Sequence, residues 1–138
     1  MTMYKRILVP TDGSKQAGRA LEHAIALAKE GARLSVLHVD PSVALNEVSM
    51  IDVSRVLEAE THEIMDAAIA KLKEAEVDFE ALIGSGYPAT VISKIANERE
   101  FDLIVMGSRG VGLMSEILLG SVSHSVAQHA RCPVLIVK

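Results

Sequence analysis

The sequence predicts an α/β protein with a single open, parallel, five-stranded sheet and helices on both of its faces. Short apolar runs alternate with longer segments of helical period, in the order βαβαβαβαβ. Most runs are apolar at successive positions, and strands buried on both sides are typical of parallel sheets between two helix layers. With 138 residues, 49% of them hydrophobic, we expect residues 1–138 to form one domain of Rossmann-like architecture.

The first strand, first helix and second strand follow from the spacing of apolar residues. One apolar run covers residues 7–9 and ends at Pro10. After it, apolar residues recur at i, i+3, i+4, i+7, i+8 and i+11, which is one face of a helix. They are Ala17, Ala20, Leu21, Ala24, Ile25 and Ala28. We expect Ser14 as the N-cap and Gly31 as the C′ residue of this helix. The second run covers residues 34–39.

The middle of the chain predicts a long connection, a helix and an edge strand. Residues 41–53 show no period and carry Pro, Ser and Asn, and a connection of that length often covers a site. The segment 57–75 has one apolar helix face, surrounded by glutamates and lysines. That face consists of Leu57, Ile64, Ala68, Leu72 and Ala75. In the run 79–83, Glu80 interrupts the apolar residues, which favours a strand at the edge of the sheet.

The last third of the chain predicts two more helices and two more strands. Pro88 suits the first turn of a helix. The apolar run 103–106 leads into a glycine-rich stretch, and a helix at 121–129 leads into a last strand at 134–137. Strand connections of this kind are right-handed, so few topologies remain.

Two of the predicted strand-to-helix turns carry unusual chemistry. They are residues 10–13, after the first strand, and residues 107–112, after the fourth. In open parallel sheets, ligands bind beyond the carboxyl ends of the strands, where the strand order reverses. We therefore expect the first and fourth strands to be neighbours, which gives the order 3-2-1-4-5 and places both turns at one crevice.

Glycines and serines after the fourth strand form the pattern of a phosphate site. Gly107, Gly110 and Gly120 are spaced as G-x2-G-x9-G, and Ser121 follows directly. Glycines let backbone N–H groups approach a ligand, and a helix that begins at residue 121 offers unpaired N–H groups and a positive dipole end. Ser121 and Ser123 add hydroxyl donors. The alternative interpretation is that Gly107 and Gly110 are turn residues and that Ser121 is an ordinary N-cap.

Composition and missing motifs argue against several other classes of protein. A net charge of −4 with 3% aromatic residues is unlike a nucleic-acid-binding protein. No apolar run approaches the ~20 residues of a membrane span, and no secretory signal is recognisable. One cysteine gives no disulfide framework, and no histidine pair has metal-ligand spacing. The P-loop lysine and the dinucleotide fingerprint are absent. We expect a cytoplasmic protein without a metal site made by its own side chains.

Three segments resemble the universal stress protein family. They are residues 7–14 (ILVPTDGS), 105–110 (VMGSRG) and 119–137, which runs from LGSVS to CPVLIV. The resemblance covers essentially the whole chain and centres on the motif G-x2-G-x9-G-[ST]. It implies a five-stranded fold of the adenine-nucleotide-binding type, usually dimeric. Members that keep this glycine pattern form the ATP-binding branch, and this sequence keeps every motif position.

The resemblance also implies which residues would contact the nucleotide. Pro10, Thr11 and Asp12 would line the adenosine side, with Asp12 near the ribose or near Mg²⁺ or Mn²⁺ bound by phosphates. Val39 would meet adenine through its backbone. Met106, Gly107, Arg109 and Gly110 would shape the ribose and phosphate loop, and Gly120, Ser121, Val122 and Ser123 would hold the phosphates. Judged without the resemblance, Asp12 could be a helix-capping acid and Arg109 part of a surface ion pair.

The resulting hypothesis is an ATP-binding regulatory protein of the stress response. ATP, or else AMP or ADP, would act mainly as a conformational signal for a protein target. No residue is assigned a catalytic role, because hydrolysis needs a positioned base and charge stabilisation at the γ-phosphate, and Asp12 is the sole obvious acid near the cradle. The alternatives are a slow ATPase or phosphotransferase, and an interaction module that binds no nucleotide.

The last strand predicts self-association. Its residues are Val134, Leu135, Ile136 and Val137. They are apolar, and the order 3-2-1-4-5 puts them at an edge of the sheet. Edge strands are usually covered or paired, and a second copy related by a two-fold axis would cover this one. We therefore expect a homodimer.

Overall fold

A parallel five-stranded sheet in the order β3-β2-β1-β4-β5 forms the centre of the molecule, as the sequence predicts. The computed structural model describes residues 3–41, 50–108 and 120–138, with only the backbone for 50–57. The strands are β1 (Arg6–Pro10), β2 (Arg33–Asp40), β3 (Phe79–Ser85), β4 (Leu103–Gly107) and β5 (Val134–Val137). The helices are α1 (Lys15–Ala28), α3 (Met50–Ala75), α4 (Pro88–Glu98) and α5 (Ser121–His129).

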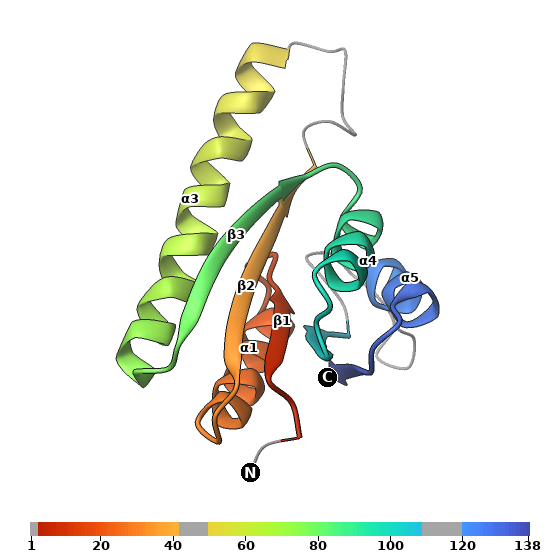
Figure 1. The fold of residues 1–138 in the computed structure, drawn as a ribbon. Coiled ribbons are helices and arrows are strands. Elements are labelled where there is room, and N and C mark those ends of the chain that lie inside the picture. Colours follow the sequence, from red (N-terminus) through yellow and green to blue (C-terminus); the bar gives the residue numbers. More distant parts are fainter. Residues whose placement is uncertain (1–2, 42–49, 109–119) are drawn as a thin grey trace.

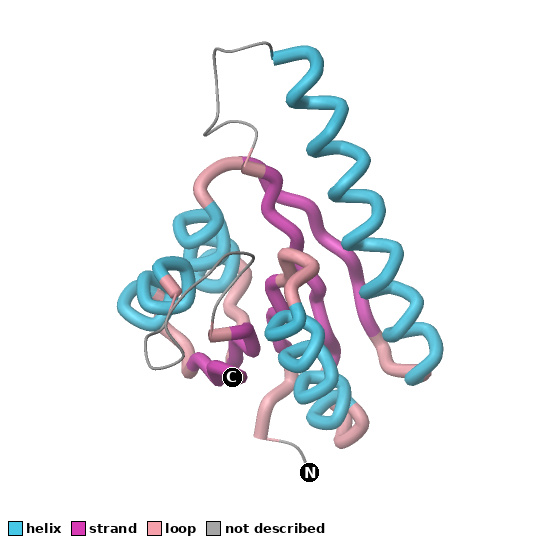
Figure 2. The backbone as a smooth tube through the Cα atoms, turned by 180° about the vertical axis from the view of Figure 1, so that it is seen from behind, coloured by secondary structure: helices cyan, strands magenta, loops and turns pink. Residues whose placement is uncertain are grey.

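Helices cover both faces of the sheet (Figures 1 and 2), which confirms the predicted three-layer arrangement. One apolar cluster joins alternate residues of the central strands to α1 and α3, and it contains Ile7 and Val36. The other cluster joins the intervening residues, such as Leu8 and Leu37, to α4 and α5. Because the strands are apolar at successive positions, each central strand contributes to both clusters. In the described part of the chain, no helix has both the length and the apolarity of a membrane span.

The start of α1 is capped as predicted, and its end lies one residue earlier than predicted. The Ser14 side chain accepts a hydrogen bond from the Ala17 N–H at 3.1 Å, which confirms Ser14 as the N-cap. The helix ends at Ala28 with Lys29 as C-cap, so Gly31 lies at C″ rather than at C′. Its φ of +120° still needs glycine, and its N–H bonds to the Ala28 carbonyl at 2.9 Å, which closes a tighter last turn.

The long helix α3 begins earlier than the sequence pattern indicates. Residues 50–53 are helical, so the expectation of a connection over 41–53 is wrong for these four positions. No Gly or Pro occurs between residues 50 and 75, so nothing stops the helix from extending beyond its amphipathic part. The stretch 42–49 lies outside the described residues. Further along α3, Ala68 and Leu72 are buried as expected, together with Met65.

The edge position of β3 is confirmed, and a polar pair explains its mixed composition. Glu80 lies opposite Ser35 in the β2–β3 register. Ser35, which is buried at 2% exposure, donates its hydroxyl hydrogen to Glu80 Oε2 at 2.7 Å. An edge strand can carry a half-buried glutamate because one side of it remains near solvent. The last strand, β5, forms the opposite edge of the sheet, also as predicted.

The pair Ser35–Glu80 yields a stability prediction. Replacing Glu80 by Ala leaves a buried hydroxyl without its acceptor, so we expect Glu80→Ala to lower the free energy of unfolding by about 1–2 kcal/mol. Glu80→Gln retains an amide oxygen as acceptor and serves as the matched control, with a loss below about 1 kcal/mol. Urea denaturation of the two variants measures the difference, and equal losses would show that the hydrogen bond contributes nothing.

Candidate functional site

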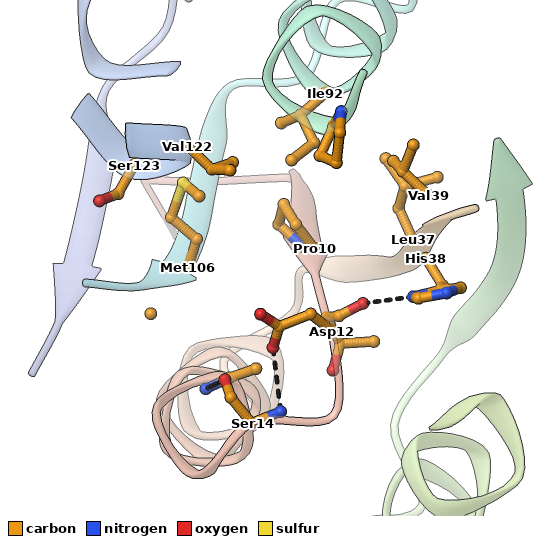
Figure 3. Close-up of a pocket in the computed structure, with 14 residues that line it drawn as sticks. Pro10, Asp12, Ser14, Leu37, His38, Val39, Ile92, Met106, Val122 and Ser123 are labelled. Carbon is orange, nitrogen blue, oxygen red and sulfur yellow. Dashed lines mark hydrogen bonds between the residues drawn. The ribbon is translucent and has the colours of Figure 1, made fainter. Parts of the chain in front are cut away.

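A cavity opens at the carboxyl ends of the central strands, at the point where the strand order reverses. It encloses about 120 Å³, and about 590 Å³ when the space at its open mouth is included. β1 and β4 meet here, with the first turns of α1, α4 and α5 around them (Figure 3). The lining residues are Pro10, Thr11, Asp12, Ser14, Ala17, Leu37, His38, Val39, Pro88, Ile92, Met106, Gly107, Val122 and Ser123.

Most of the residues predicted from the sequence line this one cavity. They are Pro10, Thr11, Asp12, Val39, Met106, Gly107, Val122 and Ser123. Gly120 and Ser121 lie at the start of α5 but not among the lining residues. Arg109 and Gly110 fall outside the described residues, so the structure gives no position for them. The turn after β1 and the end of β4 therefore line the same space, as the topology required.

Six lining residues were not predicted. They are Ser14, Ala17, Leu37, His38, Pro88 and Ile92. Ala17, Leu37 and Ile92 belong to the apolar stripes and runs that define the helices and strands. Their spacing is that of core residues, so the sequence does not distinguish residues that line a cavity from residues buried in the core. Ser14 and Pro88 were assigned only to helix starts. The available signal was positional, because both begin helices that point at the carboxyl edge of the sheet.

Asp12 is held in a closed turn at the start of α1. Asp12 Oδ1 accepts a hydrogen bond from the Ser14 N–H at 2.9 Å, and Thr11 Oγ1 accepts from the Gly13 N–H at 3.4 Å. Gly13 has φ +83°, a conformation that favours glycine. In Figure 3 the Asp12 carboxylate lies between α1 and the cavity. Ser14 is the N-cap, so the alternative that Asp12 itself caps the helix is wrong. Asp12 closes the turn before the cap, and its contact with a ligand stays a prediction.

The start of α5 is tied to the end of β4 through Ser108. The Ser108 carbonyl accepts from the Gly120 N–H at 2.7 Å and from the Ser123 hydroxyl at 2.7 Å. The N-cap is Gly120, so the alternative that Ser121 is the N-cap is wrong. Gly120 has no side chain with which to cap the first turn, and the first N–H groups of α5 have no acceptor within the helix. Ser123 gives its only hydroxyl hydrogen to a carbonyl, whereas Ser121 is solvent-exposed.

Gly107 is required by the packing of α1 on β4. A Cβ added at Gly107 would lie 2.7 Å from Gln16 Cβ, 2.9 Å from Gln16 C and 3.0 Å from Ala17 N. Two of these three atoms belong to the backbone, which cannot move aside without displacing the helix. The glycine thus lets the first turn of α1 approach the end of β4 closely. This close approach fixes the start of α1, which follows Asp12 and Ser14, relative to the end of β4.

The cavity combines apolar walls with two polar ends of opposite character. Pro10, Val39, Ile92, Met106 and Val122 supply the apolar surface. Asp12 carries a negative charge, and the start of α5 presents the positive end of a helix dipole. Such an arrangement suits a ligand with a flat apolar part, hydroxyl groups and an anionic part. In the described residues, no group of three or more His, Cys, Asp or Glu side chains could hold a metal ion.

The fold and site together define an α/β protein with a ligand cavity at the switch point of a parallel sheet. The chain belongs to the universal stress protein family, whose sequence model matches residues 3–138. It is 38% identical to the universal stress protein YxiE of Bacillus subtilis, over 99% of this chain and 100% of that one. It also resembles the solved structures of UspA from Lactobacillus plantarum (TM-score 0.88, 29% identity, all of both chains) and MJ0577 (TM-score 0.89, 34% identity, 99% and 97%).

Three further solved structures of similar fold contain nucleotides. A universal stress protein in complex with cAMP has a TM-score of 0.75 at 29% identity, and covers 97% of this chain and 96% of its own. An Arabidopsis thaliana family member with AMP bound has a TM-score of 0.73 at 25% identity, with 97% and 91% covered. An Archaeoglobus fulgidus member in complex with dAMP has a TM-score of 0.73 at 26% identity, with 99% and 100% covered.

The contact between Gly107 and α1 gives a second stability prediction. We expect Gly107→Ala to destabilise the protein by roughly 1–3 kcal/mol, because the new Cβ meets backbone atoms. Gly18→Ala, inside α1, is the matched control. Its Cβ would meet only Lys71 Nζ at 3.7 Å, so we expect a gain of about 0.5–1 kcal/mol from helix propensity. Urea unfolding compares the two variants, and a neutral Gly107→Ala would contradict the packing account.

Proposed function

We propose that this protein binds an adenine nucleotide in the cavity between the turns after β1 and β4. The base would lie against the apolar walls, the ribose would face Asp12, and the phosphates would meet the start of α5. Within this proposal the protein belongs to the ATP-binding branch of its family, with AMP and ADP as competing ligands. The observation that carries the proposal is the convergence of these chemically different surfaces on one cavity.

The apolar walls support a place for the base. Ile92 and Met106 are 3% and 5% exposed, and Val39 is nearly as buried. These side chains come from α4, β4 and β2, so they surround the space from three sides. A planar heterocycle gains from such contacts, while the backbone N–H and C=O groups at the end of β2 can provide polar recognition.

Charge supports the orientation of the ligand. The Asp12 carboxylate already meets the N–H of Ser14 at the start of α1, so an anion there would face a like charge. The start of α5 has Gly120 as its N-cap and no carboxylate among residues 120–123. Phosphate groups therefore favour α5, and ribose hydroxyl groups, which can donate to a carboxylate, favour Asp12.

The nucleotides in related structures support the ligand class. Similar folds hold AMP, dAMP and cAMP, which share adenine, a sugar and at least one phosphate. This shared chemistry matches the three surfaces of the cavity. ATP, the ligand indicated by the complete glycine motif, adds two phosphates to this shared chemistry.

The lining residues favour a signalling role for the bound nucleotide over turnover. Among the described lining residues, Asp12 is the sole carboxylate, and no lysine or arginine is present. Mg²⁺ or Mn²⁺ would be held chiefly by the phosphates, in keeping with the small number of protein ligands that Mg²⁺ requires. We propose a cytoplasmic regulatory protein whose nucleotide state is read by a protein target, in a homodimer that pairs through Val134–Val137.

Substitution of Ser121 tests the phosphate end. Ser121→Glu places a carboxylate on the first residue of α5, where it is favourable for the helix but repels phosphate. We expect AMP and ATP to bind about tenfold or more weakly, which corresponds to ~1.4 kcal/mol of repulsion. Adenosine lacks phosphate, so the distant Glu side chain should change its binding free energy by less than ~0.4 kcal/mol. Its affinity should therefore stay within about twofold of the wild-type value. Calorimetric titration measures all three affinities.

The control for Ser121→Glu is the same change one turn further along. Ser125→Glu lies on α5 but away from the cavity lining, so it should leave AMP binding unchanged. If the wild-type protein binds no adenine nucleotide, the proposed function is wrong. If Ser121→Glu binds AMP as tightly as Ser125→Glu does, the phosphates lie elsewhere.

A further inference from the structure

The backbone of Thr11 is held on both sides by β2. Its N–H donates to the Leu37 carbonyl at 2.8 Å. Its carbonyl is 2.8 Å from His38 Nδ1, a contact drawn as a dashed line in Figure 3. The first bond continues the pairing of β1 with β2, where Pro10 lies opposite Leu37. The second bond comes from a side chain, so it depends on which residue occupies position 38.

The chemistry of this contact shows which ring nitrogen of His38 donates to the Thr11 carbonyl. A backbone carbonyl can only accept, so Nδ1 must carry the hydrogen, and the neutral ring is the Nδ1–H tautomer. His38 is 7% exposed. Leu34 and Val36, which precede it on the same face of β2, belong to the apolar cluster beneath α1 and α3. An apolar residue would suit such a buried position, but it would leave the Thr11 carbonyl without this donor.

The direction of the Thr11 carbonyl determines the direction of the Asp12 N–H. The carbonyl of Thr11 and the N–H of Asp12 belong to one planar unit and point in opposite directions. A donor on β2 thus turns the Asp12 N–H away from β2. The Asp12 side chain closes back on the Ser14 N–H at 2.9 Å, so the backbone at Asp12 and this bond together hold the carboxylate.

We propose that His38 is a positioning residue for the nucleotide site. It does not need to touch the ligand, because it sets the Thr11–Asp12 peptide and thereby the aim of the Asp12 carboxylate toward the sugar. This inference deepens the proposed function, and the predicted effect of His38 on nucleotide affinity rests on it. The predicted effect of His38 on the Thr11–Asp12 turn does not depend on any ligand.

Two substitutions of matched size separate the hydrogen bond from the bulk of the side chain. The amide nitrogen of Asn reaches the position of His Nδ1, so His38→Asn retains a donor to the Thr11 carbonyl. His38→Leu has a similar branched shape without a donor. We expect AMP to bind His38→Asn within about twofold of wild type and His38→Leu about tenfold more weakly, the size of one lost buried hydrogen bond.

A double substitution tests whether His38 acts through Asp12. In an Asp12→Ala background the carboxylate is gone, so adding His38→Leu should weaken AMP binding by less than about twofold. A loss that stays near tenfold in this background would show that His38 acts on the ligand by another route. Equal losses in His38→Asn and His38→Leu would show that the donor is irrelevant. Either result overturns the proposal.

Two measurements need no nucleotide and keep the inference testable if AMP does not bind. Nitrogen-15 NMR of the wild-type protein should report the Nδ1–H tautomer for His38, and the Nε2–H tautomer would overturn the proposal. Amide hydrogen exchange at Ser14 should be about tenfold faster in His38→Leu than in His38→Asn, because the Asp12 turn opens more often. Equal exchange in the two variants would also overturn it. Absence of AMP binding in the wild type contradicts only the proposed function.

Discussion

The pairing of β1 with β4 is the constraint on which the rest of the structure depends. Ile7 and Leu8 lie opposite Leu103 and Ile104, so the strand order reverses between these two strands and their carboxyl ends meet at one edge of the sheet. The close approach of α1 to Gly107 then sets the distance between the start of α1 and the end of β4. The apolar walls come from β1, β4 and the elements packed beside them, and Val39, Ile92 and Met106 both belong to a buried cluster and line the cavity.

Much of the fold could be predicted because the sequence patterns that indicate helices, caps and strands involve residues close together in the chain. The stripe of α1, the cap at Ser14 and the edge position of β3 each follow from side chains within a few residues of one another. The start of α3 could not be predicted in the same way. Residues 50–53 have neither a clear stripe nor a helix breaker, and a helix already nucleated further along extends through such a segment at little cost.

Less of the candidate site could be predicted, for a physical reason. Asp12 occurs in the turn after β1 and Ser123 in the first turn of α5, where the sequence pattern departs from that of the core. Ile92 and Leu37 occur inside stripes and runs, and which end of a buried strand or helix faces a cavity depends on how the layers pack. The role of Gly107 was only partly anticipated. The sequence indicated a close backbone approach there, but the approaching group is the first turn of α1.

Methyl NMR during a titration with AMP tests the central claim most directly, because it reports where a ligand binds. The account predicts saturable shifts for the methyl groups of Val39, Met106 and Val122, which line the cavity. The methyl groups of Leu34 and Leu72, buried in the cluster beneath α1 and α3, should stay unchanged. Absence of any shift, or equal shifts in both sets, would contradict the assignment of this cavity as the nucleotide site.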